Sequence, residues 1–168
     1  MMKLRPRDLI MIALVVVIVL IIAVFGFPNT GSTEVSIKSN LTIDFANVPS
    51  PTNQGMNTTW KMTGGSSTSS ISNNSQGQTV WIFENITSKS NCYDQLVSAS
   101  RIAGFEIGSQ NQTLGLIVTS IGGAANLEFE GRAWQYYVNG MYANRACNIV
   151  TVANDDHVIW KYQPNQLG

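Results

Sequence analysis

The strongest constraint on the fold is a pair of alternating aromatic segments near the C-terminal end of the chain. Residues 134–138 read Trp-Gln-Tyr-Tyr-Val, and residues 158–162 read Val-Ile-Trp-Lys-Tyr. Side chains two positions apart in a strand share a face, so each segment presents three large apolar side chains to one side. Asn139 and Gly140 form a typical hairpin turn. The pattern predicts paired strands that close one core.

A long apolar run precedes the part of the chain that could form such a core. Residues 9–27 contain no charged side chain, and a helix of that length matches the hydrocarbon thickness of about 30 Å. We therefore predict a transmembrane helix at 9–27, with a cytoplasmic N-terminus at 1–8 and a linker at 28–34. A cleaved signal peptide is the alternative, although residues 25–28 are a poor match to a small-residue cleavage site.

The charges around the apolar run predict its orientation. Lys3, Arg5 and Arg7 precede it, and the next basic residue is Lys38. Basic residues stay on the cytoplasmic side, so we expect a single-pass protein of the cell membrane, with residues 35–168 as an extracytoplasmic domain. The exported part is nearly neutral, because seven basic and nine acidic residues occur from residue 28 onward. No basic surface is available for nucleic acid.

Cys92 and Cys147 are the two cysteines of the chain. Their spacing fits no metal or redox motif and predicts one structural disulfide in an oxidising compartment. A reactive Cys92 at the start of a helix is the alternative.

Five Asn-x-Ser/Thr triplets also fit an exported surface and are candidate glycosylation sites. They begin at Asn40, Asn57, Asn73, Asn85 and Asn111.

Apolar periodicity predicts the order of elements in the exported part. Alternation over 35–45 indicates a half-buried strand, and residues 47–78, rich in Asn, Ser, Thr, Pro and Gly, are expected to form a long polar loop. A short strand around Trp60 and Met62 could interrupt that loop. Residues 79–86 favour a buried strand, with a short helix capped by Thr79 as the alternative.

The clearest helix lies at 91–104. Asn91 is a good N-cap, Asp94 stands at the third position of a capping box, and Gly104 follows the last turn. We expect Leu96, Val97, Ser100 and Ala103 to form its apolar face. A strand at 114–121 follows and ends at two glycines. The predicted fold class is α+β, a β-grasp-like domain with one main helix.

This order of blocks resembles the transcobalamin-like C-terminal domain family. The helix at 93–104, the strand ending Val118-Thr119-Ser120-Ile121-Gly122, the block 134–140 and the strand 158–162 match in sequence, so the resemblance covers about 79–162. It implies a small exported module. The large helical domain that holds cobalamin in the animal carriers is absent, so corrinoid binding is not implied. The turn before the last strand reads Asn154-Asp155-Asp156 instead of the family's Gly-Asp.

No arrangement of residues in the sequence supports catalysis or a cofactor. Asp155, Asp156 and His157 could suggest a metal or an acid-base pair, but adjacent residues diverge and no further ligands complete a zinc site. Glu128 and Glu130 are read as a solvated acidic edge. No nucleophilic triad or phosphate loop is present. We predict that the protein is not an enzyme.

The best candidates for contact with a ligand or partner are Tyr137, Asn139 and Tyr142, at the rim of the aromatic hairpin. The sequence thus predicts a membrane-anchored binding or adhesion module outside the cytoplasm, which contacts a small ligand or another envelope protein. The alternative is an accessory subunit of a larger membrane complex.

Overall fold

The computed structural model describes residues 36–48, 58–64, 69–73, 75–127 and 131–164. These residues belong to one compact unit, 35–168. The predicted cytoplasmic, membrane and linker segments at 1–34 lie outside the described residues. Within the described part, no helix is both long enough and apolar enough to cross a membrane.

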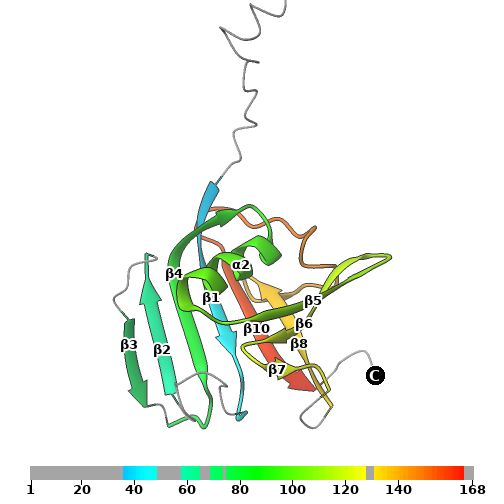
Figure 1. Ribbon diagram of the computed structural model, residues 1–168. Coiled ribbons are helices and arrows are strands. Elements are labelled where there is room, and N and C mark those ends of the chain that lie inside the picture. The colour runs from blue at the N-terminus through cyan, green and yellow to red at the C-terminus, as the bar shows by residue number, and fades with distance from the viewer. Residues whose placement is uncertain (1–35, 49–57, 65–68, 74, 128–130, 165–168) are drawn as a thin grey trace, which may run out of the picture. The chain divides into compact units, whose positions relative to one another are not determined.

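A seven-stranded sheet forms one layer of the domain (Figure 1). Its spatial order is β3-β2-β4-β1-β10-β8-β9. The bounds in that order are Ser69–Asn73, Thr58–Thr63, Val80–Lys89, Ser36–Asp44, His157–Pro164, Arg132–Val138 and Met141–Tyr142. The pairs β1–β10 and β2–β4 are parallel, and the other pairs in this sheet are antiparallel. The predicted strands at 35–45 and 79–86 are confirmed as β1 and β4.

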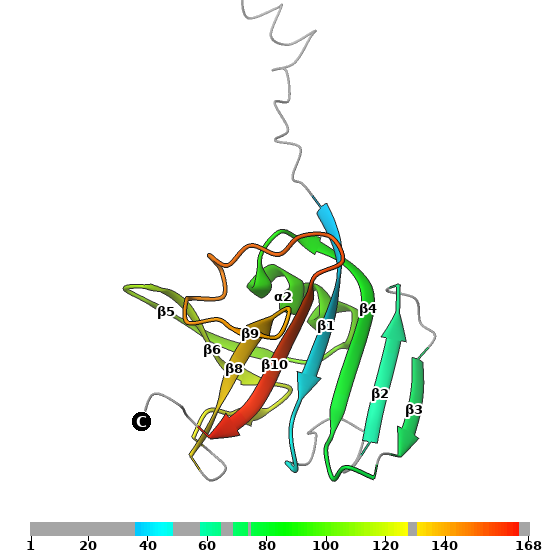
Figure 2. The same cartoon turned by 180° about the vertical axis from the view of Figure 1, so that it is seen from behind.

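One face of this sheet is covered by a helix and a second sheet. Helix α2 (Cys92–Ala103) packs on β4 and β1. The second sheet has the order β5-β6-β7, with bounds Ile107–Gln112, Gly115–Ile121 and Ala124–Ala125. Both lie in front of the large sheet in Figure 1 and behind it in the opposite view of Figure 2. The core lies between these layers.

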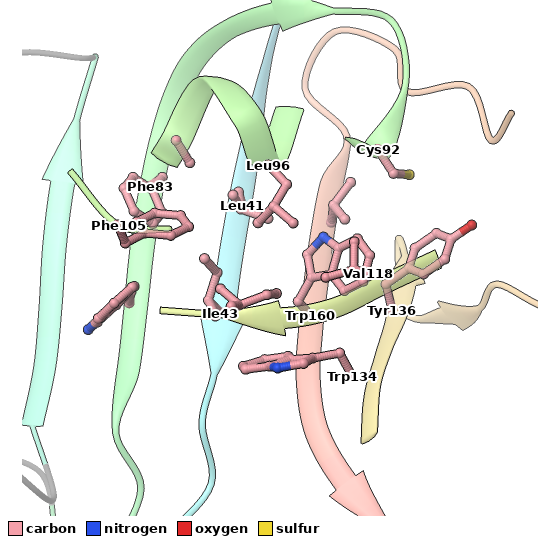
Figure 3. Packing of buried hydrophobic residues seen from close by; sticks show 14 of the residues in the cluster. Leu41, Ile43, Phe83, Cys92, Leu96, Phe105, Val118, Trp134, Tyr136 and Trp160 are labelled. Carbon is pink, nitrogen blue, oxygen red and sulfur yellow. The ribbon is translucent and has the colours of Figure 1, made fainter. Parts of the chain in front are cut away.

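The predicted aromatic rows meet in the core. Trp160 pairs with Tyr136 across β10 and β8, and Tyr162 pairs with Trp134. All four side chains are buried. The rings of Tyr136 and Trp160 stack at 4.8 Å, and those of Trp134 and Tyr162 lie 5.1 Å apart. Figure 3 shows Val118 of β6 over Trp160, so the small sheet closes the core from the other side. The shared aromatic core is confirmed.

The caps of α2 are as predicted. Asp94 N donates to Asn91 Oδ1 at 2.8 Å, Asn91 Nδ2 donates back to the Asp94 carboxylate at 2.7 Å, and Gly104 ends the helix at φ 73°. The predicted apolar face was right for Leu96, which is buried, and in part for Ala103, which packs against the core, whereas Val97 and Ser100 are only half-buried. The buried residues are Cys92, Gln95, Leu96 and Ala99. A polar side chain, Gln95, belongs to the buried face, which a count of apolar residues could not indicate.

The predicted α+β class with a membrane helix was also wrong for the described residues, which form ten strands and a single helix of 12 residues. Strands β2 and β3 lie within the stretch 47–78 that we expected to be a long loop, and β2 contains Trp60 and Met62. Many residues of these strands are Ser and Thr, so their sequences show little apolar periodicity. Pairing with β4 supplies the backbone hydrogen bonds that the local sequence did not indicate.

Candidate ligand-binding groove

A groove of about 590 Å³ opens between β6, β8 and the segment that follows β9. Residues 142–147 and Ile149 line it, and we call the whole stretch 142–149 the groove segment. Its volume lies within the range of about 300 to 1,000 Å³ that is typical of small-molecule sites. The groove therefore has room for a ligand of modest size.

Three side-chain hydrogen bonds hold the groove segment beside the two strands. Tyr136 Oη donates to the carbonyl of Arg145 at 2.7 Å. Leu116 N donates to Asn148 Oδ1 at 3.0 Å, and the thiol of Cys147 donates to Leu116 O at 3.4 Å. The groove wall is thus anchored to both β8 and β6.

The floor of the groove is aromatic. Trp134, Tyr136 and Trp160 all line it, and each belongs to the buried core. Figure 3 shows the rings of Trp160 and Tyr136 side by side, with Trp134 below them. Their positions follow from the alternation along β8 and β10, so the same pattern that builds the core also builds the base of the groove.

The rim carries apolar side chains that are exposed to solvent. Leu114 is 86% exposed, Ile149 55%, Ile117 40% and Tyr142 38%, and all four line the groove. The other large apolar side chains that are exposed in the described part are Ile71, Leu127 and Met141. A cluster of exposed apolar side chains around one hollow is a frequent sign of a binding surface.

A smaller hollow of about 290 Å³ lies beside the groove segment and includes Met141, Thr151 and Val138. It shares Tyr142, Ala143, Asn144, Arg145 and Ile149 with the groove. We regard the larger groove as the candidate binding site, because the buried aromatic side chains line the groove and not the smaller hollow.

Arg145 is the charged residue of the groove lining. None of the described residues that line the groove is an Asp or a Glu. Two of the lining amides are already engaged, since Asn126 bonds Val118 O and Trp134 N, and Gln135 donates to Pro164 O. The site is therefore apolar at its base and rim, with one cationic side chain.

The structure has Cys92 and Cys147 as unbonded, buried thiols, so it does not show the predicted disulfide. The two segments are nevertheless joined through the backbone. Tyr93 N donates to Cys147 O at 3.1 Å, and Cys92 N donates to Val150 O at 3.2 Å. The disulfide stays a prediction, and it would connect the start of α2 to the groove segment.

Burial raises the pKa of Cys92 to about 12, with a further contribution from the neighbouring Cys147, and it raises the pKa of Cys147 to about 11. Both thiols are therefore protonated at neutral pH, which argues against a reactive Cys92. Burial also raises the pKa of Tyr136.

These shifts predict a loss of stability in alkali for the reduced protein. The unfolded chain releases its thiol protons near pH 9, whereas the folded chain holds them to pH 11 or above, so the free energy of unfolding should fall as pH rises through this window. Urea unfolding at pH 8 and pH 10, with a reductant present, measures the effect. Cys92→Ala with Cys147→Ala should weaken this pH dependence, and an unchanged dependence would contradict the assignment.

The three predicted contact residues have different positions. Tyr142 lines the groove. Tyr137 does not, because its ring lies on the other face of β8, 5.6 Å from Tyr142, and its hydroxyl accepts from Gln163 Nε2 at 2.8 Å. Asn139 shapes the turn at φ 50°, and its side chain bonds Asp156 Oδ1 and His157 N. We therefore read Asn139 as a structural residue.

The sequons differ in accessibility. Asn73, Asn85 and Asn111 are exposed, Asn40 is half-buried with its Oδ1 accepting from Asn85 N at 3.1 Å, and Asn57 lies outside the described residues. The structure places no modification on them, so glycosylation stays a prediction.

Asp156 and His157 make contacts within the protein. Asp156 accepts from Ala153 N and Asn139 Nδ2, and His157 Nε2 lies 2.8 Å from Thr42 Oγ1. Burial lowers the pKa of His157. No cluster of three or more potential metal ligands occurs among the residues that the structure describes. Glu128 and Glu130 lie outside them.

Sequence reasoning missed the remaining groove residues, including Leu114, Ile117, Arg145 and Ile149. A signal existed for Leu114, since it is a large apolar residue at the tip of the β5–β6 hairpin, where polar residues are usual. The groove segment contained no comparable signal, because its position depends on contacts with β6 and β8.

Comparison with protein-family models identifies one match. Residues 98–164 match the family model described as a domain of unknown function (DUF4430). The matched stretch contains β6, β8, the groove segment and β10, and it overlaps most of the region that resembles the transcobalamin-like domains. It covers less than half of the chain. A comparison with curated proteins found no match.

Two solved structures are similar to this one. Haptocorrin in complex with Cbi has a TM-score of 0.47 and 12% identity, with 79% of this chain covered but only 26% of that one. A protein from Ruminococcus gnavus ATCC 29149, suspected to bind metal, has a TM-score of 0.40 and 13% identity, with 66% of this chain and 97% of that chain covered. Scores below 0.5 support no conclusion about the ligand of this chain.

Proposed function

We propose that this protein is a non-catalytic binding module that holds a small, mainly apolar ligand in the groove between β6 and β8. The observation that carries the proposal is the position of the exposed apolar side chains. Leu114, Ile117, Tyr142 and Ile149 surround a hollow with an aromatic floor. Covering these side chains with a ligand would remove apolar area from water, at a gain of about 25 cal/mol per Å².

The chemistry of the groove supports binding more than catalysis. Apart from Arg145 and Tyr142, the described lining contains Cys147 and Tyr136 as groups that can ionise, and burial keeps both of these protonated at neutral pH by raising their pKa values. General acid-base catalysis needs a group whose pKa lies near the working pH. Neither of these two groups meets that condition.

We further propose that the domain works outside the cytoplasm. The support is that three basic residues immediately precede the apolar stretch at 9–27 and none follows it before Lys38, together with the exposed sequons at Asn73, Asn85 and Asn111. A cytoplasmic location of residues 35–168 in a protease-accessibility assay on intact cells would contradict this part of the proposal.

A neutral fluorescent dye, N-phenylnaphthylamine, tests the groove itself. Replacing Leu114 and Ile149 together with serine should weaken dye binding about thirtyfold, because two apolar contacts of about 1 kcal/mol each are lost. The matched control replaces Leu127 and Ile71 with serine, since these side chains are 66% and 59% exposed and neither lines the groove. Dye binding should remain unchanged in that control.

Equal effects of the two double variants, or no dye binding to the full chain, would contradict the proposed groove. The accessory-subunit alternative predicts a different result. The rim of the groove would then be covered by another protein, and purification from native membranes would yield this chain with integral subunits in a fixed ratio.

A further inference from the structure

We infer that the groove selects amphipathic anions, in which an apolar chain ends in one carboxylate or sulfonate group. The inference rests on the proposed function and specifies the ligand class for the same groove. The apolar chain would lie between the rim and the aromatic floor. The anionic group would pair with Arg145.

The balance of charge in the groove favours an anion. Arg145 is the charged side chain among the described residues of the lining, and none of those residues is an Asp or Glu that would neutralise it. The structure gives its guanidinium no hydrogen bond or ion pair with any described residue. A ligand carboxylate could therefore form the two parallel hydrogen bonds that guanidinium groups favour.

A hydrogen bond from the core fixes the backbone of Arg145. Its carbonyl accepts the hydrogen bond of Tyr136 Oη at 2.7 Å, and Tyr136 is itself stacked on Trp160 in the core. Arg145 also lines the smaller hollow on its flank. The backbone is thus fixed at the side of the aromatic floor, while the side chain is exposed and can turn toward a bound anion.

The shape of the lining favours a single chain over a bulky polar molecule. Leu114, Ile117 and Ile149 stand at the rim, and Val118 and Trp134 lie deeper, so apolar contacts are available along the length of the groove. Among the described residues, the polar groups of the lining that lack a hydrogen bond include the side-chain amides of Gln112 and Asn144 at its exposed margin and the buried indole N–H of Trp160. An uncharged sugar or a dianionic phosphate would find few polar partners there.

Three probes with the same alkyl chain test the inference: decanoate, decanol and decyltrimethylammonium, each below its micelle concentration. Calorimetric titration of the full chain should show decanoate binding most tightly and the cation most weakly. Arg145→Gln should weaken decanoate binding about threefold to tenfold and leave decanol within twofold, because an exposed ion pair contributes modestly.

Arg101→Gln is the control, since Arg101 is an exposed arginine in the last turn of α2 and does not line the groove. It removes the same charge and should leave all three affinities unchanged. The anion preference would be overturned if decanoate and decanol bound equally tightly, or if Arg101→Gln weakened decanoate binding as much as Arg145→Gln. In either case the dye experiment could still support the groove. Failure of the dye and of all three probes would overturn both.

Discussion

Replacing Gln95 with glutamate is expected to lower the free energy of unfolding by about 3–5 kcal/mol at pH 7. Gln95 is fully buried on α2 and connects the helix to β1. Its Nε2 donates to Ser39 Oγ at 2.7 Å and to Asn40 O at 3.0 Å. A carboxylate in this position has no N–H to donate, so the hydrogen bond to Asn40 O is lost and a charge is buried facing that carbonyl oxygen. The contact with Ser39 can persist only if its hydroxyl turns round to donate.

The stability of this variant should also depend on pH, which gives a second test of the buried position of Gln95. Burial would raise the pKa of the introduced carboxyl above the usual value of about 4.3. As pH falls through that raised pKa, the carboxyl gains a proton, loses its charge and can donate a hydrogen bond to Asn40 O. The deficit relative to the wild type should therefore shrink between pH 7 and pH 5.

Urea unfolding at these two pH values is the measurement. Gln110→Glu is the matched control, because Gln110 is exposed on β5 and the same change there adds a charge without burying it. That variant should differ from the wild type by less than about 0.5 kcal/mol. If both variants were equally stable, Gln95 would not have the buried position described here.

Gln95 also illustrates which parts of the fold were predictable from the sequence. The ends of α2 followed from Asn91, Asp94 and Gly104, since capping depends on residues close together in the chain. The buried face of α2 did not, because a glutamine enters a core only where distant groups, here Ser39 and Asn40, accept its hydrogen bonds. Such partners are not apparent from local sequence.

The same contrast holds for the sheet and the groove. Alternation in β8 and β10 predicted the aromatic core, whereas β3 has the sequence Ser-Ser-Ile-Ser-Asn and becomes a strand through pairing with β2. Of the three predicted contact residues, only Tyr142 reached the groove. The groove lies where β6, β8 and residues 142–149 meet. Which residues line it is therefore decided by tertiary contacts, and no sequence pattern relates these three segments to one another.

The contact between β6 and the groove segment leads to the second large prediction, which concerns Gly115. Gly115 has φ +120°, which side chains rarely adopt. A Cβ added there would lie 2.5 Å from Ala146 Cβ and 2.9 Å from Asn148 Oδ1. We expect Gly115→Ala to lower the free energy of unfolding by about 2–4 kcal/mol, from backbone strain and from crowding.

Gly104→Ala measures the cost of a positive φ in the absence of crowding. Gly104 also has a positive φ, +73°, but nothing lies within 4 Å of its added Cβ. Its substitution should cost about 1 kcal/mol, so the excess for Gly115→Ala should come from crowding and from the less favourable backbone angle. Urea unfolding of both variants measures the difference, and equal losses would show that the close approach to Ala146 is not important.

A third substitution tests whether crowding acts through the groove segment. Ala146→Gly removes the methyl group nearest to the added Cβ, so the double variant should recover part of the loss of Gly115→Ala. The backbone strain and the contact with Asn148 would remain, and recovery should therefore be incomplete.

Gly115→Ala alone should push Cys147 and Asn148 away from Leu116 and weaken dye binding, and the double variant should restore part of that binding. If stability recovered but dye binding did not, the contact between β6 and the groove segment would affect stability without affecting the groove. That result would contradict the role proposed here for the groove segment.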